Sequence, residues 1–133
     1  MITLYHGSDV EIERPRLDLC KPFKDFGKGF FLSADRQQAQ ELAEQRSRQT
    51  LEGSPKVTAY LFDERLITSG ELKVLTFDDY SEEWVKFILA NRDIHHFQPV
   101  HDYDIVYGPI ADDGVTFQYF FGTQRALDKL TKL

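Results

Sequence analysis

The sequence predicts an α+β domain, and three observations favour that fold class. Short runs with strand composition occur at residues 2–6, 30–32, 56–62, 72–77, 103–107 and 115–121. Two longer stretches, after Asp35 and after Ser81, carry apolar residues at helical spacing. No internal repeat or linker-like tract interrupts the chain. We therefore expect one domain over residues 1–133, with two packed antiparallel sheets and flanking helices.

The first half of the chain supplies the first three strands and a helix. Residues 2–6 alternate apolar and polar side chains, and Gly7-Ser8 is expected to end that strand. Residues 9–25 contain two prolines and mixed charge, which indicates an irregular loop. After the strand at 30–32, Ser33 or Asp35 is available to cap a helix that continues to the Gly-Ser-Pro at 53–55. The next strand spans 56–62.

The second half predicts three more strands and two helices. A polar turn around residues 68–70 precedes the strand at 72–77, and Ser81 is placed to cap a helix with Trp84 and Phe87 on its buried side. The strand at 103–107 is expected to stop at Gly108-Pro109, and a turn at 112–114 to lead into the last strand, 115–121. Thr123 can cap a closing helix whose apolar residues are Ala126, Leu127, Leu130 and Leu133.

Composition narrows the class of protein. Hydrophobic residues make up 41% and aromatic residues 14% of the chain, which is typical of a globular protein with an aromatic core. A single cysteine, Cys20, allows no internal disulfide, and no leader or membrane-length apolar run is present, so we expect a cytoplasmic protein with no membrane partner. Residues 61–133 hold the whole net charge of -6, which disfavours a broad nucleic-acid interface. Basic residues from Arg14 to Lys28 would suit a diphosphate, or are simply solvated.

Residues 25–33, Asp-Phe-Gly-Lys-Gly-Phe-Phe-Leu-Ser, are the first candidate site. A phosphate-binding glycine loop is disfavoured, because no Ser or Thr follows Lys28 and no complete GxGxxG pattern occurs. The stretch is otherwise either a turn before a core strand or an aromatic platform for a flat heterocyclic ligand. These two interpretations stay open on composition alone.

Three motifs together resemble the ADP-ribosyltransferase superfamily. They are His6-Gly7-Ser8, the run from Phe26 to Asp35, and Gln118-Tyr119, which resemble the His-Gly-Ser, Phe-Gly-Lys-Gly-Ile-Tyr-Phe-Ala-Asp and Glu-Tyr motifs of its poly-ADP-ribose-polymerase branch. The chain is most similar to a bacterial family of short, functionally unassigned ADP-ribosyltransferase-like proteins with the patterns DFGKGFY, W..F...NR, YDIV.GP.ADD and Q..F.T..AL. Two residues depart from the His-Tyr-Glu class: Phe31 replaces the tyrosine and Gln118 the glutamate.

The resemblance implies a split β-sandwich and a site for NAD, the substrate that donates ADP-ribose. It assigns the nicotinamide amide to the backbone of Gly7, a ribose to His6, ring stacking to Phe31, a ribose hydroxyl to Ser33 and the nicotinamide ribose to Gln118. The catalytic residues would be His6 and Gln118. The residues that bind NAD would be His6, Gly7, Ser8, Gly29, Phe30, Phe31 and Ser33.

By the same resemblance, the expected activity is mono-ADP-ribosyl transfer to a macromolecule. The acceptor, protein or nucleic acid, stays open, and so does a role as a toxin or defence effector held by a small antitoxin-like protein. Because an amide offsets developing positive charge less than a carboxylate does, Gln118 predicts single-unit transfer or slow NAD hydrolysis, and not chain-building. A nearby acid could restore the charge, and the candidates are Asp112, Asp113, Glu82 and Glu83. The alternative is a catalytically silent domain that binds NAD or ADP-ribose, or a protein-interaction module.

Two further groups of polar residues are considered. His95, His96 and His101, with Asp102 and Asp104, match no zinc signature, so no metal site is expected. Asn91-Arg92 either fixes the end of its helix or faces the ligand; the sequence leaves both open.

Overall fold

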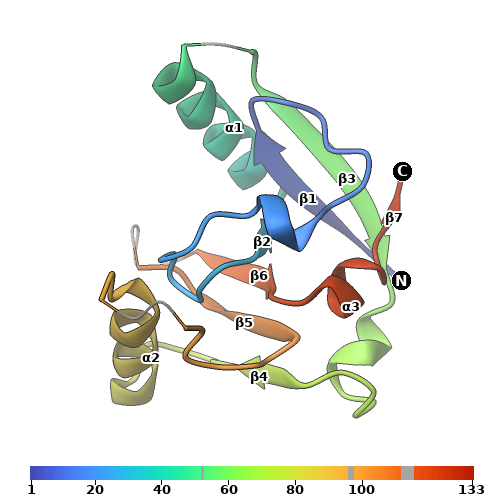
Figure 1. The fold of residues 1–133 in the computed structure, drawn as a ribbon. Coiled ribbons are helices and arrows are strands. Elements are labelled where there is room, and N and C mark those ends of the chain that lie inside the picture. Colours follow the sequence, from blue (N-terminus) through green and yellow to red (C-terminus); the bar gives the residue numbers. More distant parts are fainter. Residues whose placement is uncertain (52, 96–97, 112–115) are drawn as a thin grey trace.

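The computed structural model describes residues 1–51, 53–95, 98–111 and 116–133, which form two sheets and three α-helices (Figure 1). One sheet has the order β1-β3-β7, built from β1 (Ile2–Ser8), β3 (Lys56–Phe62) and β7 (Thr131–Lys132). The other has the order β2-β6-β5-β4, built from β2 (Phe30–Leu32), β6 (Phe117–Phe121), β5 (Ile105–Pro109) and β4 (Val74–Thr76). The α+β class is therefore confirmed.

The helices cover the outer faces of the two sheets. α1 (Arg36–Thr50) lies along β1 and β3, and α2 (Glu82–Arg92) lies beside the four-stranded sheet (Figure 1). The third helix, α3 (Gln124–Leu127), and two 3-10 turns, Leu17–Leu19 and Glu64–Ile67, lie in the connections. Of the helices that the structure describes, none has both the length and the apolar composition needed to cross a bilayer.

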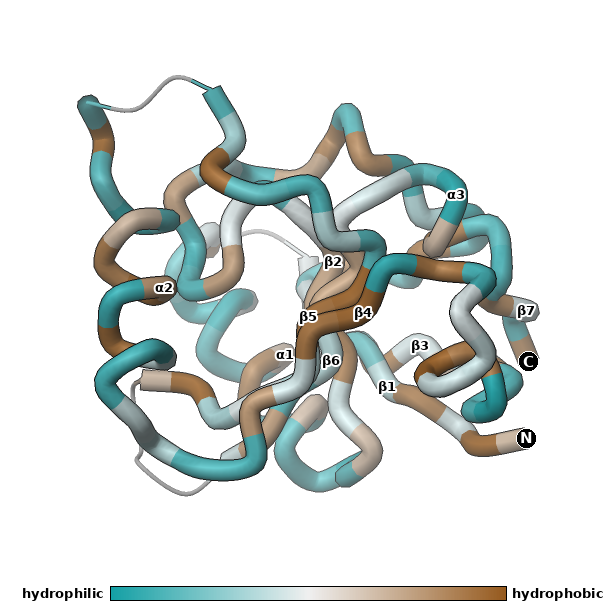
Figure 2. Tube along the Cα trace, turned by 90° about the horizontal axis from the view of Figure 1, so that it is seen from below, coloured by the Kyte–Doolittle hydropathy of each residue, from teal (hydrophilic) through white to brown (hydrophobic). Residues whose placement is uncertain are grey.

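Two hydrophobic clusters hold these layers together. The larger one lies between the sheets and includes Leu4, Phe30, Tyr60 and Phe121. The smaller one lies between the four-stranded sheet and α2 and consists of Phe26, Trp84, Ile88, Val106 and Phe120. Hydrophobic positions along β4 and β5 run through the centre of the molecule (Figure 2). Because side chains alternate along a strand, adjacent residues such as Phe30 and Phe31 pack into different clusters.

Local capping signals were predicted correctly. The Asp35 side chain accepts a hydrogen bond from Gln37 N at the start of α1, Ser81 accepts one from Trp84 N at the start of α2, and Thr123 caps α3. Trp84 is 7% exposed and is a core anchor as expected. In α1, by contrast, the buried side is only Ala39 and Ala43, while Leu42 is 38% exposed.

Several predicted boundaries and one strand pairing were wrong. β4 pairs with β5 in parallel, because α2 connects them and returns the chain to the same edge of the sheet. β5 continues through Gly108 and Pro109, which pair with the end of β6, and a proline is tolerated at a strand end. The closing helix ends at Leu127, and the chain then forms β7 against β3. The turn expected at 112–114 lies outside the described residues.

β1 also extends beyond its expected end. Gly7 and Ser8 pair with Val57 and Lys56, so the strand does not stop at His6. A Cβ atom on Gly7 would overlap the carbonyl oxygen of Ala39, so glycine here allows α1 to lie directly on the strand. Gly7 is thus a packing residue of the helix–sheet contact as well as a candidate site residue.

Replacing Gly7 by Ala tests this packing. We expect Gly7→Ala to lower the free energy of unfolding by about 1–3 kcal/mol or more, because α1 must shift outward. Gly70→Ala is the control: Gly70 has a φ of 85° but no atom within 4 Å of an added Cβ, so only about 1 kcal/mol of backbone strain is expected. Urea denaturation measures both; equal losses would contradict the close contact between α1 and β1.

Candidate functional site

Among the described residues, one backbone bridge joins the two sheets, at Tyr5 of β1. Tyr5 and Ser33 exchange backbone hydrogen bonds, with Tyr5 N to Ser33 O at 2.7 Å and Ser33 N to Tyr5 O at 2.8 Å. Beyond this bridge β2 leaves β1 and pairs with β6 instead. We call the place where β1 and β2 diverge the split.

The His6 side chain lies between β1 and β2 at the split. Its Nδ1 lies 2.7 Å from the carbonyl oxygen of Phe31, and its ring stacks on Phe30 with centroids 3.9 Å apart. Since a carbonyl oxygen only accepts, Nδ1 carries the proton in the neutral ring and Nε2 keeps a free lone pair. Burial, and to a smaller extent the Arg46 charge, lowers the pKa of His6 to about 4, against the Phe31 hydrogen bond, which raises it. The imidazole is therefore a neutral acceptor at physiological pH.

The backbone of Gly7 also faces the split. In an antiparallel ladder, alternate residues direct their N–H and C=O groups to opposite edges of the strand. Tyr5 directs both groups to Ser33, away from β3, so Gly7, two residues on, does the same. One donor and one acceptor from a single residue thus point into the split.

A cavity of about 310 Å³ opens beside Ser33. The Ser33 hydroxyl donates to Gln38 Oε1 at 2.6 Å and accepts from Asp35 N at 2.9 Å, so it is held at the start of α1. The opposite wall is aromatic: the ring of Tyr107 lies 4.5 Å from that of Tyr119 and 5.5 Å from that of Phe117, centroid to centroid. Burial raises the pKa of the Tyr119 hydroxyl, which keeps it a neutral donor.

Phe31 and Gln118 direct their side chains to the other face of the four-stranded sheet. The Phe31 ring packs on the rings of Phe120 and Phe26, with centroids 5.2 and 6.1 Å apart. Gln118 lies two residues before Phe120 in β6, so its side chain is on the same face of the sheet as Phe120. Gln118 is only 5% exposed, yet no hydrogen bond joins its amide to any other residue that the structure describes. Among the described residues only Ser47 Oγ is a fully buried side-chain nitrogen or oxygen atom without a partner, and Gln118 lines neither the cavity of about 310 Å³ nor a second one of about 810 Å³.

The predicted site residues therefore fall into three groups. His6, Gly7, Phe30 and Ser33 gather at the split. Phe31 and Gln118 lie on adjacent strands but face away from the His6 ring. The remaining two have local roles: Ser8 Oγ donates to Asp9, and Gly29 lies against the Phe120 ring, where a Cβ would overlap it.

Sequence reasoning missed the aromatic wall and Gln38. Phe117 and Tyr119 flank Gln118 in β6, so strand alternation places them on the opposite face from Gln118. Applying period-two alternation to 117–119 would have drawn attention to these rings. Tyr107 could not have been added, since it depends on the Tyr107–Tyr119 register of β5 and β6.

Two side chains from other parts of the chain, Arg92 and His101, hold the loop before β2 in place. Asp25, 8% exposed, accepts from the Arg92 guanidinium at the end of α2 and from Ala111 N at 2.9 Å. His101 Nε2 lies 2.7 Å from the Phe26 carbonyl, while its Nδ1 accepts from Tyr103 N. Arg92 thus joins the loop to the end of α2, and Asn91 Nδ2 donates to a backbone carbonyl within the helix. A role of either side chain toward a ligand stays a prediction.

The histidines and acids near residue 100 are engaged elsewhere. His101 uses both ring nitrogens, and Asp104 accepts from Lys73 N, Thr123 Oγ1 and Arg125. Within the described residues no three His, Cys, Asp or Glu side chains are grouped to hold a metal ion, and His96 lies outside them.

The lowered pKa of the His6 ring predicts that the stability of the protein depends on pH. The folded-state pKa of about 4 lies below the usual 6.5, so between these values the unfolded chain binds more protons. The free energy of unfolding should fall as pH drops from 6.5 to 4, by up to about 3 kcal/mol from this residue. His6→Gln should flatten that part of a urea-denaturation profile, while His95→Gln, at an exposed position, should not. Identical profiles for His6→Gln and wild type would refute the half-buried neutral ring.

The Asp25 anchor predicts a stability loss that exceeds that of a surface ion pair. Asp25→Ala leaves Ala111 N and Arg92 without this acceptor, and we expect the free energy of unfolding to fall by about 2–4 kcal/mol. Asp18→Ala, which removes the exposed Asp18–Arg16 pair, should change it far less. Native-state trypsin digestion should also cleave Asp25→Ala faster at Lys24 and Lys28. Unchanged cleavage there would show that Asp25 does not fasten the loop.

Comparison with known proteins gives a family but no activity. No curated protein matches the sequence. Residues 2–121, from the start of β1 to the end of β6, match the family described as "Protein of unknown function (DUF3990)". The match covers both sides of the split and the whole four-stranded sheet. The chain therefore belongs to the DUF3990 family.

Proposed function

We propose that this protein is an NAD-dependent mono-ADP-ribosyltransferase with an ADP-ribosyltransferase-like split β-sandwich. The observation that supports this most is the split, where the neutral His6 ring lies beside the backbone N–H and C=O of Gly7, for which the described residues supply no partner. A backbone N–H beside a C=O is the pair that a carboxamide, such as that of nicotinamide, can bind through two hydrogen bonds. The His6 Nε2 lone pair would accept from a ribose hydroxyl.

The cavity beside Ser33 is where we place one end of the dinucleotide. Its volume of about 310 Å³ is at the small end of the range for ligand pockets. Tyr107, Phe117 and Tyr119 would offer their faces to a flat ring. In this proposal these rings take the stacking role expected of Phe31, whose own ring is packed on Phe26 and Phe120.

The chemistry requires negative charge near the anomeric carbon. Cleavage of the nicotinamide–ribose bond develops positive charge on the sugar, and loss of one preorganised charged group costs on the order of 3 kcal/mol. Gln118 can orient a ribose but offsets little of that charge. Asp35, an exposed residue whose Oδ1 also caps α1, lines the Ser33 cavity and is the acid we propose for this role. Glu82 and Glu83 lie on α2 and do not line that cavity, and Asp112 and Asp113 lie outside the described residues. We expect transfer of single ADP-ribose units at a low rate.

The acceptor and the biological setting follow from the same proposal. The acceptor is a macromolecule, either protein or nucleic acid, and the protein acts in the cytoplasm, where its one thiol, Cys20, stays reduced. A role as a toxin or defence effector, with a small antitoxin-like protein as its partner, is part of this proposal and rests on the family resemblance alone.

A second candidate is a silent domain that binds NAD or ADP-ribose without turnover, or a protein-interaction module. Two observations favour it: Gln118 has no charge, and its side chain lies on the opposite face of the sheet from the His6 ring. The two candidates differ in turnover and share the nucleotide site. A pure interaction module would bind no nucleotide.

Calorimetry and a nicotinamide-release assay separate these candidates. We expect wild-type protein to bind NAD with micromolar affinity, and His6→Ala to weaken binding at least tenfold by removing a buried hydrogen-bond acceptor. Incubation with labelled NAD and cell lysate should label a macromolecule slowly. Gln118→Glu should raise the rate of nicotinamide release by tenfold or more.

Matched controls are available on the surface. His95→Ala and Gln37→Glu change the same residue types at exposed positions and should leave binding and turnover unaltered. Binding without release or labelling, in wild type and in Gln118→Glu, would favour the silent nucleotide-binding domain. Absence of NAD binding would remove both nucleotide-dependent functions.

A further inference from the structure

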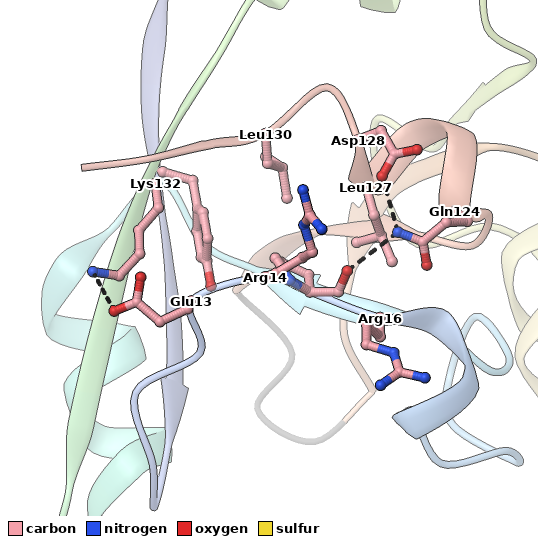
Figure 3. Close-up of a pocket in the computed structure, with 10 residues that line it drawn as sticks. Glu13, Arg14, Arg16, Gln124, Leu127, Asp128, Leu130 and Lys132 are labelled. Atoms are coloured by element: carbon pink, nitrogen blue, oxygen red, sulfur yellow. Dashed lines mark hydrogen bonds and ion pairs between the residues drawn. The ribbon is translucent and has the colours of Figure 1, made fainter.

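A second and larger cavity, of about 810 Å³, opens between residues 13–16 and the C-terminal segment 124–132 (Figure 3). Its apolar lining comes from Pro15, Leu127 and Leu130, backed by the buried ring of Tyr60. Tyr60 donates to Ile12 O at 2.6 Å, and the Gln124 side chain donates to Pro15 O at 3.2 Å and accepts from Leu17 N at 3.0 Å. These bonds fix the loop that forms one wall, so the cavity is a built feature of the fold.

The charged groups around this cavity are paired, with one exception. Glu13 pairs with Lys132 at 3.2 Å, Arg16 with Asp18 at 2.6 Å, and Asp128 accepts from Gln124 Nε2 at 3.0 Å. Arg14 has no ion partner among the residues that the structure describes. Its side chain reaches into the space beside Leu130 (Figure 3). An unpaired guanidinium therefore faces an apolar wall.

We propose that this cavity binds a monoanionic carboxylate with an apolar body. Arg presents a planar fork that matches a carboxylate through two parallel hydrogen bonds. Leu127, Leu130 and Pro15 would cover the apolar part of the same ligand. The other cations that line the cavity are paired with carboxylates, so among the described lining residues Arg14 is the cation left for a ligand. Its single charge matches a carboxylate better than a doubly charged phosphate.

Such a ligand can be a free small acid or the carboxyl end of a peptide with an apolar last residue. Both present one carboxylate next to a hydrocarbon group, so the site chemistry is shared. The cavity has no lining residue in common with the one beside Ser33, and the proposal is independent of NAD binding or turnover.

Calorimetric titration with two matched probes tests the proposal. N-acetyl-leucine carries a carboxylate, and N-acetyl-leucinamide has the same body without the charge. We expect wild-type protein to bind the acid about tenfold or more tightly than the amide, the difference typical of a charge-assisted hydrogen bond. Arg14→Gln should abolish that preference. Arg16→Gln, at the same cavity but with its guanidinium held by Asp18, should retain it.

Further outcomes identify the source of the ligand or overturn the proposal. Tighter binding of hexanoate than of N-acetyl-leucine supports a free acid, and the reverse order supports a peptide end. Equal binding of the acid and the amide, no binding of any carboxylate, or an acid preference that survives Arg14→Gln overturns it. Because Arg14 is exposed, unchanged thermal unfolding should accompany Arg14→Gln and verify that the variant is folded.

Discussion

The backbone bridge between Tyr5 and Ser33 is the constraint on which the rest of the structure depends. It joins the two sheets, and His6 prevents the pairing from continuing by placing its ring over Phe30 and its Nδ1 on the Phe31 carbonyl. That carbonyl would otherwise face an unpaired strand edge, so the histidine satisfies it while holding the strands apart. The split is thus a consequence of one side chain replacing a ladder hydrogen bond.

The split keeps its shape because both of its sides are anchored independently. α1 begins at Arg36, three residues after Ser33, and rests on the Gly7 backbone, which fixes β1. On the other side, Asp25 and His101 fasten the loop that delivers β2, and their contacts come from α2 and from the segments around β5. Buried acids that accept several hydrogen bonds are costly to leave unpaired, so these anchors resist opening of the loop.

Local features of this fold could be predicted from the sequence, and features set by register could not. The strand at 56–62 and the caps at Asp35, Ser81 and Thr123 depend on residues within one turn of each other. Parallel pairing of β4, and the addition of β7 to β3, depend on where distant segments meet. The same limit applies to the site. The motifs correctly predicted that His6 and Phe31 lie on neighbouring strands, but side chains alternate along a strand, so the Phe31 ring lies on the opposite face of the sheet from His6.

The role of the Gln118 side chain in the candidate site is limited by its surroundings. The side chain is 5% exposed and no described residue bonds its amide, yet among the described residues only Ser47 Oγ is a fully buried side-chain nitrogen or oxygen atom without a partner, so Gln118 bears no comparable cost. A carboxylate at this position would bear a larger desolvation cost in the absence of a ligand cation. A ligand in the Ser33 cavity would meet Asp35 and the aromatic wall, whereas Gln118 faces α2 on the other side of the sheet. In the proposed function, charge stabilisation at this cavity therefore falls to Asp35.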